Sequence, residues 1–208
     1  MSEPEHNALS LRLSGTGEPE RADAARNRRL LLAAAQTLID TRGAAGVTMD
    51  AVAAAAGVGK GTVFRRFGSR TGLMHALLDH SESELQQAYL SGPEPLGPGA
   101  PPLDRLLAYG RARLKMTVDH LDVLLEAGAD SGEFMKHPVW RASTQHVQIL
   151  LRQLGFGDDV HTVAIAVQAP LAASSVQHLT DTVGLDIATI TDQWERMVRT
   201  LAAGCATN

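Results

Sequence analysis

Cysteine is almost absent from this 208-residue sequence, since Cys205 is the only one. A single cysteine excludes a disulfide framework and a zinc site built from cysteine pairs, and it fits a reducing, cytoplasmic location. Aromatic residues make up only 4% of the chain, and no stretch alternates apolar and polar residues as half-buried strands do. These absences leave an all-α protein as the expected fold class.

Long apolar runs are also missing, because no 18 consecutive residues are apolar. The chain starts with Ser2, Glu3, Pro4 and Glu5 after the initial methionine, which is unlike the basic and then apolar start of an export signal. The sequence therefore predicts neither a membrane span nor secretion. Residues 1–20 contain too few apolar side chains to offset the entropy of ordering them, so we expect a disordered tail there.

The net charge of -4 hides a strong asymmetry along the chain. Between residues 21 and 70, nine lysines and arginines stand against three aspartates, which gives this segment a net charge of +6. The other residues must then sum to -10. A basic segment on an acidic body is typical of a protein that neutralises DNA phosphates with one domain. A chance cluster of solvated charges is the alternative interpretation.

Three helical patterns lie inside this basic segment. Apolar residues recur at three- and four-residue steps from Ala22 to Ile39, and Gly43 is placed to end that helix. Thr48 is a suitable N-cap for a second short helix, Gly57 ends it, and a third helix follows over residues 60–66. Two short helices joined by a glycine turn predict a helix-turn-helix. The apolar side chains expected to face inward are Val52, Val58, Val63 and Phe67.

The rest of the chain is also predicted to be helical, with one clear interruption. A fourth helix is expected over residues 73–90. Residues 91–102 hold five prolines and three glycines, so no helix continues through them. Four further helices are expected over residues 103–126, 137–154, 158–180 and 186–203, with a kink at Pro170. A short turn around residues 132–135 brings the total to about nine helices.

We therefore expect three parts: a tail over residues 1–20, a three-helix DNA-binding domain over residues 21–70, and a helical bundle over residues 71–208. No metal site is expected, because His75 and His80 are five residues apart and the other histidines form no metalloprotease pattern. No cofactor is expected either.

The segment from Val47 to Arg70, VTMDAVAAAAGVGKGTVFRRFGSR, resembles the TetR family of bacterial transcriptional regulators. The family's hallmark is a run like V-T-x-x-x-I-A-x-x-A-G-V-S-K-G-T-L-Y-x-H-F-x-x-K, and the spacing matches throughout. The preceding LLLAAAQTLIDTRGAAGVT is similar to the family's first helix, so the resemblance covers about residues 25–85. It implies a DNA-binding regulator that is not an enzyme.

The resemblance places Thr48 and Arg70 on phosphates that flank the groove. Lys60 can donate to guanine acceptors, Gly61 permits close approach of the backbone, and the side chain of Thr62 can touch a base edge or a phosphate. Arginines near the groove add affinity that depends on salt. The expected DNA-binding residues are Thr48, Lys60, Gly61, Thr62, Phe64, Arg65, Arg66 and Arg70.

Two positions depart from the family pattern. Gly59 replaces the serine that usually caps the recognition helix, and Phe64 replaces a tyrosine whose hydroxyl contacts phosphate. One side-chain cap and one hydrogen bond are therefore missing. Arg66, where histidine or tyrosine is common, could restore a phosphate contact, so we expect altered contacts with DNA and not a loss of binding.

In the TetR family the last two helices pair with their copies in a dimer, and the resemblance implies the same arrangement here. Residues 186–203 carry one apolar stripe that would face the second copy. The alternative is that this stripe belongs to an ordinary internal core. The expected interface residues are Leu171, Ser175, His178, Ile190, Trp194, Met197 and Leu201.

The resemblance also implies a small-molecule effector that binds in a cavity of the helical bundle. Soft or aromatic surface beside isolated polar groups is typical of such cavities, although each candidate is more commonly a plain core residue. The expected lining residues are Met116, His120, Phe134, Trp140, Thr144, Val147 and Gln168.

These observations predict a repressor that binds a palindromic operator as a homodimer and is released by its effector. One alternative is a DNA-binding regulator without a small-molecule ligand, whose carboxyl-terminal domain serves protein–protein interaction. Another is an enzyme with an accessory helix-turn-helix, because Ser174, Ser175 and His178 lie close in sequence. No Gly-x-Ser-x-Gly turn or aspartate accompanies them, so no catalytic residue is assigned.

Overall fold

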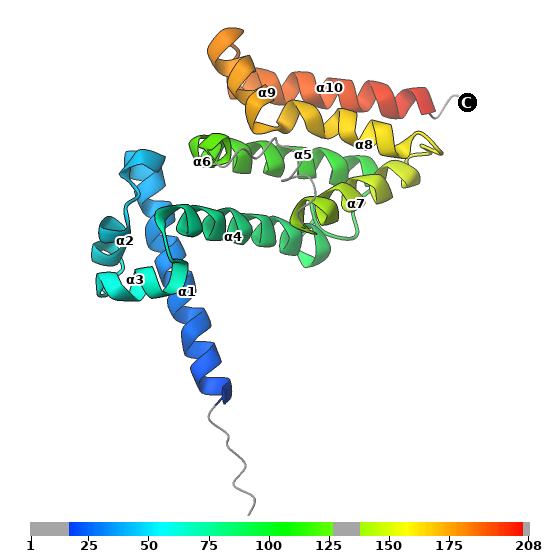
Figure 1. The fold of residues 1–208 in the computed structure, drawn as a ribbon. Helices are drawn as coiled ribbons and strands as arrows, with labels where there is room; N and C mark the ends of the chain where they lie inside the picture. The colour runs from blue at the N-terminus through cyan, green and yellow to red at the C-terminus, as the bar shows by residue number, and fades with distance from the viewer. Residues whose placement is uncertain (1–16, 127–137, 206–208) are drawn as a thin grey trace, which may run out of the picture.

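The structure is a computed structural model, and it describes residues 17–126 and 138–205. Over these residues the protein consists of helices and connecting turns, with no β-strand (Figure 1). The all-α prediction is therefore confirmed. The ten α-helices are α1 (Gly17–Arg42), α2 (Met49–Ala55), α3 (Lys60–Phe67), α4 (Arg70–Ser91), α5 (Pro102–Asp119), α6 (Leu121–Glu126), α7 (Pro138–Gln153), α8 (Val160–Gln168), α9 (Ala173–Gln177) and α10 (Ile187–Cys205).

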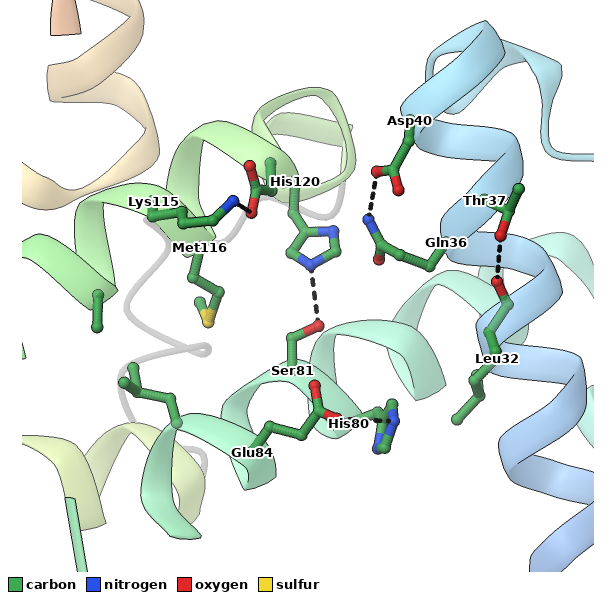
Figure 2. Close-up of a pocket in the computed structure, with 14 residues that line it drawn as sticks. Leu32, Gln36, Thr37, Asp40, His80, Ser81, Glu84, Lys115, Met116 and His120 are labelled. Atoms are coloured by element: carbon green, nitrogen blue, oxygen red, sulfur yellow. Dashed lines mark hydrogen bonds and ion pairs between the residues drawn. The ribbon is translucent and has the colours of Figure 1, made fainter. Parts of the chain in front are cut away.

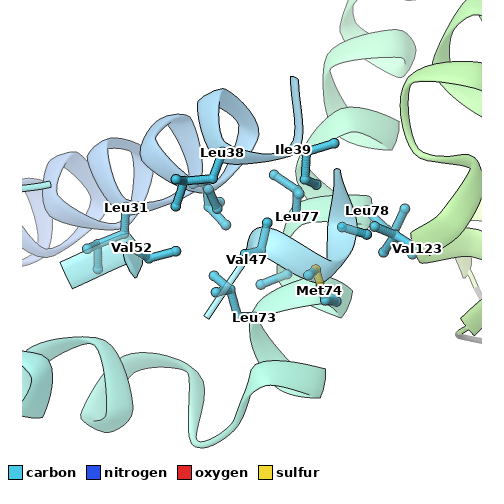
Figure 3. Packing of buried hydrophobic residues seen from close by; sticks show 14 of the residues in the cluster. Leu31, Leu38, Ile39, Val47, Val52, Leu73, Met74, Leu77, Leu78 and Val123 are labelled. Atoms are coloured by element: carbon cyan, nitrogen blue, oxygen red, sulfur yellow. The ribbon is translucent and has the colours of Figure 1, made fainter. Parts of the chain in front are cut away.

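The amino-terminal part, which we call the head (residues 17–78), packs α1, α2, α3 and the start of α4 around one apolar core. Leu31, Val52, Val63 and Leu73 are at most 1% exposed in this core. Leu78 of α4 and Val123 of α6 both belong to this apolar core, and Figure 3 shows the two side by side. The core of the head therefore extends beyond residue 70, where the sequence placed the domain boundary, and takes in part of α6.

The predicted tail over residues 1–20 is too long, because α1 begins at Gly17. Residues 18–29 are mostly glutamate, alanine and arginine, which have high helix propensity. Extending an existing helix by such residues is much easier than nucleating a new one. The apolar pattern that was used to place the helix start does not register this extension. Residues 1–16 lie outside the described part of the chain.

The remaining helices form the body (residues 79–126 and 138–205). In Figure 1, α8, α9 and α10 form a layer on one side of α5, while α4 and α7 lie on its other side. The body has its own buried core, in which Leu106, Leu114, Leu150 and Val176 are at most 2% exposed. None of the helices in the described part of the chain combines the length and the apolar character of a membrane span.

Two of the predicted body helices are broken in the structure. The helix expected over residues 103–126 stops at His120, whose backbone leaves the helical region (φ -121°, ψ 20°) before α6 begins. The helix expected over residues 158–180 ends at Gln168, and the chain then forms a 3-10 turn that contains Pro170. Ala172 is then extended (ψ 153°), so Pro170 marks a complete break and not only a kink.

The interruption before α5 is confirmed, because no helix covers residues 92–101. The turn expected around residues 132–135 lies outside the described residues. The two breaks divide helices that the sequence predicted as continuous, and the described residues contain ten α-helices against about nine predicted helices.

Candidate nucleic-acid interface

The helix-turn-helix geometry is built by one cap and one glycine. The hydroxyl of Thr48 accepts the backbone N–H of Ala51 at 3.1 Å, so Thr48 is the N-cap of α2 as predicted. Gly57 adopts a positive φ of 66° between α2 and α3, a conformation that disfavours residues with a Cβ. Gly59 precedes α3 and supplies no side-chain cap, as its sequence implies. These features fix where the third helix starts.

The face of α3 that points into the head is apolar, as the sequence predicted. Val63 is 0% exposed, and Val58 and Phe67 are partly buried against the same core. The opposite face is open to solvent, and the Phe64 ring is 42% exposed there. A basic, exposed helix face with a buried apolar back is the arrangement that a recognition helix needs. The exposed residues of α3 are Lys60, Gly61, Phe64, Arg65 and Arg66.

Lys60 at the start of α3 is held by a neighbour from α2. Its Nζ lies 2.7 Å from the carboxylate of Asp50 and 5.6 Å from the centre of the Phe64 ring. Both charged side chains remain more than half exposed, so the pair contributes little to stability. Lys60 is therefore positioned at the surface, with Asp50 as its partner.

Arg65 and Arg66 are neighbours in sequence with different surroundings. Arg66 donates from Nη2 to the backbone carbonyl of Ala24 in α1. Arg65 is exposed and has no polar partner among the described residues. Arg65 is consequently the arginine of α3 that is most free to reach a phosphate.

Arg70 is engaged inside the protein, although the sequence assigned it to a phosphate. Its Nε donates to the carbonyl of Val47 at 3.0 Å and its Nη2 to the carbonyl of Ala44 at 2.9 Å. Its Nη1 forms an ion pair with Glu126 of α6 at 2.6 Å. The structure thus gives Arg70 a role in holding the turn before α2 against α4 and α6. Sequence reasoning missed it because backbone carbonyls leave no signal in a sequence.

The residues predicted to line an effector cavity are only partly brought together. Gln168 and Thr144 are in contact, with a Gln168 Nε2 to Thr144 Oγ1 distance of 3.5 Å. Met116 and His120 instead line a groove between α1, α4 and α5. Val147 is fully buried in the body core. Phe134 lies outside the described residues, as does the side chain of Trp140.

A buried polar network in the body was not predicted from the sequence. Arg113 of α5 donates to both carboxylate oxygens of Glu82 in α4, and its Nη2 lies 2.9 Å from Ser143 Oγ of α7. Burial opposes the charge of Arg113, but Tyr109 and Glu82 raise its pKa above the ordinary value. Gln168 accepts from the Tyr109 hydroxyl at 3.3 Å and so joins the network to α8. Glu82 and Arg113 are 31 residues apart, so no helical spacing connects them.

Part of the predicted dimer stripe is buried within the chain. Leu171, Ile190 and Trp194 are 2%, 3% and 4% exposed in the body core, and Trp194 Nε1 donates to the Val167 carbonyl at 2.7 Å. This corrects their assignment to an interface and favours the internal-core interpretation. His178 and Leu201 are exposed, whereas Ser175 and Met197 are half-buried.

The residues that raised the enzyme alternative lie on or next to the short helix α9. Ser174 and Ser175 are in α9, and His178 begins the π-helical turn that follows it. His178 is exposed. Within residues 17–126 and 138–205, no three His, Cys, Asp or Glu side chains are grouped so as to hold a metal ion.

Comparisons with known proteins agree with this geometry. Residues 31–77 match the family model described as bacterial regulatory proteins, tetR family. No match was found among curated proteins.

Solved structures with the same fold include a TetR regulator from Streptomyces coelicolor (18% identity, 86% of this chain and 97% of that chain, TM-score 0.63). A TetR-family regulator from Pectobacterium atrosepticum has 21% identity over 89% of this chain and 96% of its own, with a TM-score of 0.60. A transcriptional regulator from Saccharomonospora viridis, in complex with choline, has 20% identity over 84% of this chain and 96% of its own, with a TM-score of 0.62.

At these identities the solved structures establish the fold, and the sequence match is confined to residues 31–77. Residues 31–77, from within α1 to within α4, are therefore similar to the amino-terminal domain of the bacterial regulatory proteins of the tetR family, and the described residues have the fold of the solved regulators of that family.

Proposed function

We propose that this protein is a repressor that binds a palindromic operator as a homodimer and leaves it when a small molecule binds the body. The observation that carries the proposal is the exposed basic face of α3 on a TetR-type head. In this proposal Lys60, Gly61 and Thr62 meet base edges, while Phe64, Arg65 and Arg66 line the groove wall. Thr48 stays at a flanking phosphate with its hydroxyl already capping α2.

DNA binding is tested at Arg65, which is exposed and unengaged within the described residues. Removal of one phosphate contact by Arg65→Gln is expected to weaken binding about tenfold and to reduce the slope of log K against log salt by about 1. The measurement is a fluorescence anisotropy titration at several salt concentrations, with a duplex selected from a random pool by the wild-type protein.

Arg152→Gln is the matched control, because Arg152 is an exposed arginine on α7 in the body. We expect it to leave affinity and salt slope unchanged. Equal effects of the two variants would mean that the charge of the whole protein matters and that α3 does not form the interface.

The dimer is proposed to form through the outer face of α8 together with α10. Ile165 of α8 is 56% exposed, and Ala166 and Ala169 extend this surface by one turn. Small side chains allow helices to approach closely, and Ile165 supplies apolar area to bury. Leu201 of α10, which is 37% exposed, stays in the proposed interface.

Ile165→Glu is expected to convert a dimer into a monomer, because two carboxylates would be buried without partners. Light scattering coupled to size-exclusion chromatography measures the mass. Leu90→Glu is the control, since Leu90 is 64% exposed and belongs to α4, which lies on the other side of α5 from α8. A wild-type monomer, or a dimer that survives Ile165→Glu, contradicts the proposal.

The effector is proposed to bind within the body, near Gln168 and Thr144. The regulator from Saccharomonospora viridis binds choline, which supports a small-molecule ligand for a protein of this fold. The alternative is a body that serves protein–protein interaction. A compound that raises the melting temperature and also releases operator DNA favours the first function, since ligand binding stabilises the folded state by mass action.

A further inference from the structure

A second candidate binding site lies where the head meets the body. A groove of about 740 Å³ runs between α1 of the head and α4 and α5 (Figure 2). Its apolar surface comes from Leu32, Leu85 and Met116, which are largely buried. Such a volume holds a small organic molecule. The groove is separate from the Gln168–Thr144 region, because none of its lining residues belongs to α7 or α8.

Carboxylates from three helices surround this apolar surface. Asp40 of α1 accepts a hydrogen bond from Gln36 at 2.8 Å, and Glu84 of α4 lies 3.5 Å from His80. Asp119 of α5 pairs with Lys115 at 2.6 Å. Lys115 is the one lysine or arginine in the groove lining, so the carboxylates outnumber it three to one and the groove favours a cation.

His120 adds an unused hydrogen-bonding atom to the groove. The residue is 4% exposed, and its Nε2 lies 2.9 Å from Ser81 Oγ. Its Nδ1 is buried and has no hydrogen-bond partner among the described residues. A buried polar atom without a partner costs free energy that a suitable ligand would recover.

The charge state of His120 decides what this atom can bind. Burial lowers the pKa of His120, and the effect exceeds the opposing influence of Asp119 and Asp40. The ring is therefore neutral at neutral pH, and when Nε2–H donates to Ser81 its Nδ1 is an acceptor. Figure 2 shows His120 facing Gln36 and Asp40 across the groove. Nδ1 is therefore the atom of His120 that a ligand N–H could reach from the groove.

We propose that this groove binds a small organic amine, with its apolar part against Met116 and Leu85 and its ammonium group between Asp40, Glu84 and His120. One ammonium N–H donates to Nδ1 of His120 and the others to the carboxylates. Because α1 belongs to the head and α5 to the body, the bound amine bridges the two. Its affinity would then be coupled to that of the operator, a consequence that rests on the proposed function.

The probe is 2-phenylethylamine, titrated by calorimetry into the full chain without DNA. Three molecules with a similar apolar part serve as comparisons: 2-phenylethanol has no charge, 3-phenylpropanoate has the opposite charge, and N,N,N-trimethyl-2-phenylethylammonium has no N–H. We expect the amine to bind about tenfold or more tightly than each, because only it donates charge-assisted hydrogen bonds to the carboxylates and to His120. Equal or tighter binding of the alcohol or the acid would overturn the proposal.

Variants at exposed positions locate the site without risk to folding. Ala33 of α1 is exposed and lines the groove, so Ala33→Phe is expected to fill it and abolish amine binding. Ala25→Phe, at an exposed alanine two turns earlier in α1, should bind as the wild type does. Binding that survives Ala33→Phe would place the amine elsewhere and overturn the proposal.

The charge requirement is tested by Asp40→Asn, which we expect to weaken amine binding about threefold to tenfold. Asp79→Asn removes an exposed carboxylate of α4 outside the groove and is expected to have no effect. Equal effects of the two would show general attraction by a negative protein and refute a specific site. This readout needs no DNA, so its failure and a failure of operator binding are separate results.

Discussion

Glu82→Ala is expected to lower the free energy of unfolding by about 3–5 kcal/mol, because it leaves the charge of Arg113 buried without its partner. Both side chains of this pair are 5% exposed. The Ser143 and Tyr109 hydroxyls lie 2.9 Å and 3.4 Å from Arg113 Nη2 but carry no compensating charge. Urea unfolding followed by circular dichroism measures the loss.

Two controls separate this effect from general damage to α4. Glu84→Ala removes an exposed glutamate two residues later, and we expect a change within about 0.5 kcal/mol. The double variant Glu82→Leu with Arg113→Met removes both charges and is expected to recover most of the stability. A double variant as unstable as Glu82→Ala would mean that packing, and not the unpaired charge, explains the loss.

Gly110→Ala is expected to destabilise the protein by about 1–3 kcal/mol, although alanine favours a helix more than glycine does. Gly110 lies in α5 directly under the indole of Trp194, and a Cβ built there would be 1.9 Å from the ring atom Cη2. Trp194 cannot retreat freely, because its Nε1 is bonded to the Val167 carbonyl. The helices α5 and α10 would have to move apart.

A double-mutant cycle with Trp194→Phe tests this mechanism, since the smaller ring leaves space for the methyl group. In that background we expect Gly110→Ala to cost much less, and the difference is the coupling between the two residues. Gly61→Ala is the control for helix propensity, because a Cβ at Gly61 would meet no atom within 4 Å apart from its chain neighbours and the nearby backbone of α3 itself. Additive effects of Gly110→Ala and Trp194→Phe would refute a steric clash.

The head could be predicted in detail because its determinants are local. The Thr48 cap, the Gly57 turn and the inward valines each depend on residues within a few positions of one another. The fold class followed from composition and helical spacing for the same reason. The breaks at His120 and Ala172 were harder to place, because a buried side chain and a rigid proline override a continuous apolar pattern.

The apolar stripe over residues 186–203, which includes Trp194, shows what helical spacing leaves undetermined. Apolar residues at three- and four-residue steps predict a covered face, but not which surface covers it. In the structure α5 of the same chain covers it, through the space left by Gly110. The exposed surface at Ile165 on α8 has a weaker apolar pattern than the stripe of α10 around Trp194. Helical spacing alone would therefore not identify it as an interface.

The sequence identified the arginines at the end of the basic segment but not the contacts that they make within the protein. Arg65, Arg66 and Arg70 look equivalent in the sequence, yet Arg66 binds a carbonyl of α1 and Arg70 binds two carbonyls and Glu126. Their partners are backbone atoms or residues far along the chain. The groove at His120 depends on three helices meeting, so its residues could be named from the sequence only in part.

The ion pair between Lys60 and Asp50 withholds one positive charge from phosphates for as long as it stays closed. If α3 binds DNA as proposed, a phosphate offers Lys60 only the exchange of one anion for another, so on arbitrary sequence the head would rest on DNA mainly through its arginines. Opposite a guanine, the Lys60 ammonium can exchange Asp50 for base acceptors, and the freed carboxylate can accept from a cytosine amino group. We therefore expect this pair to favour discrimination between sites over strength of attachment to DNA in general.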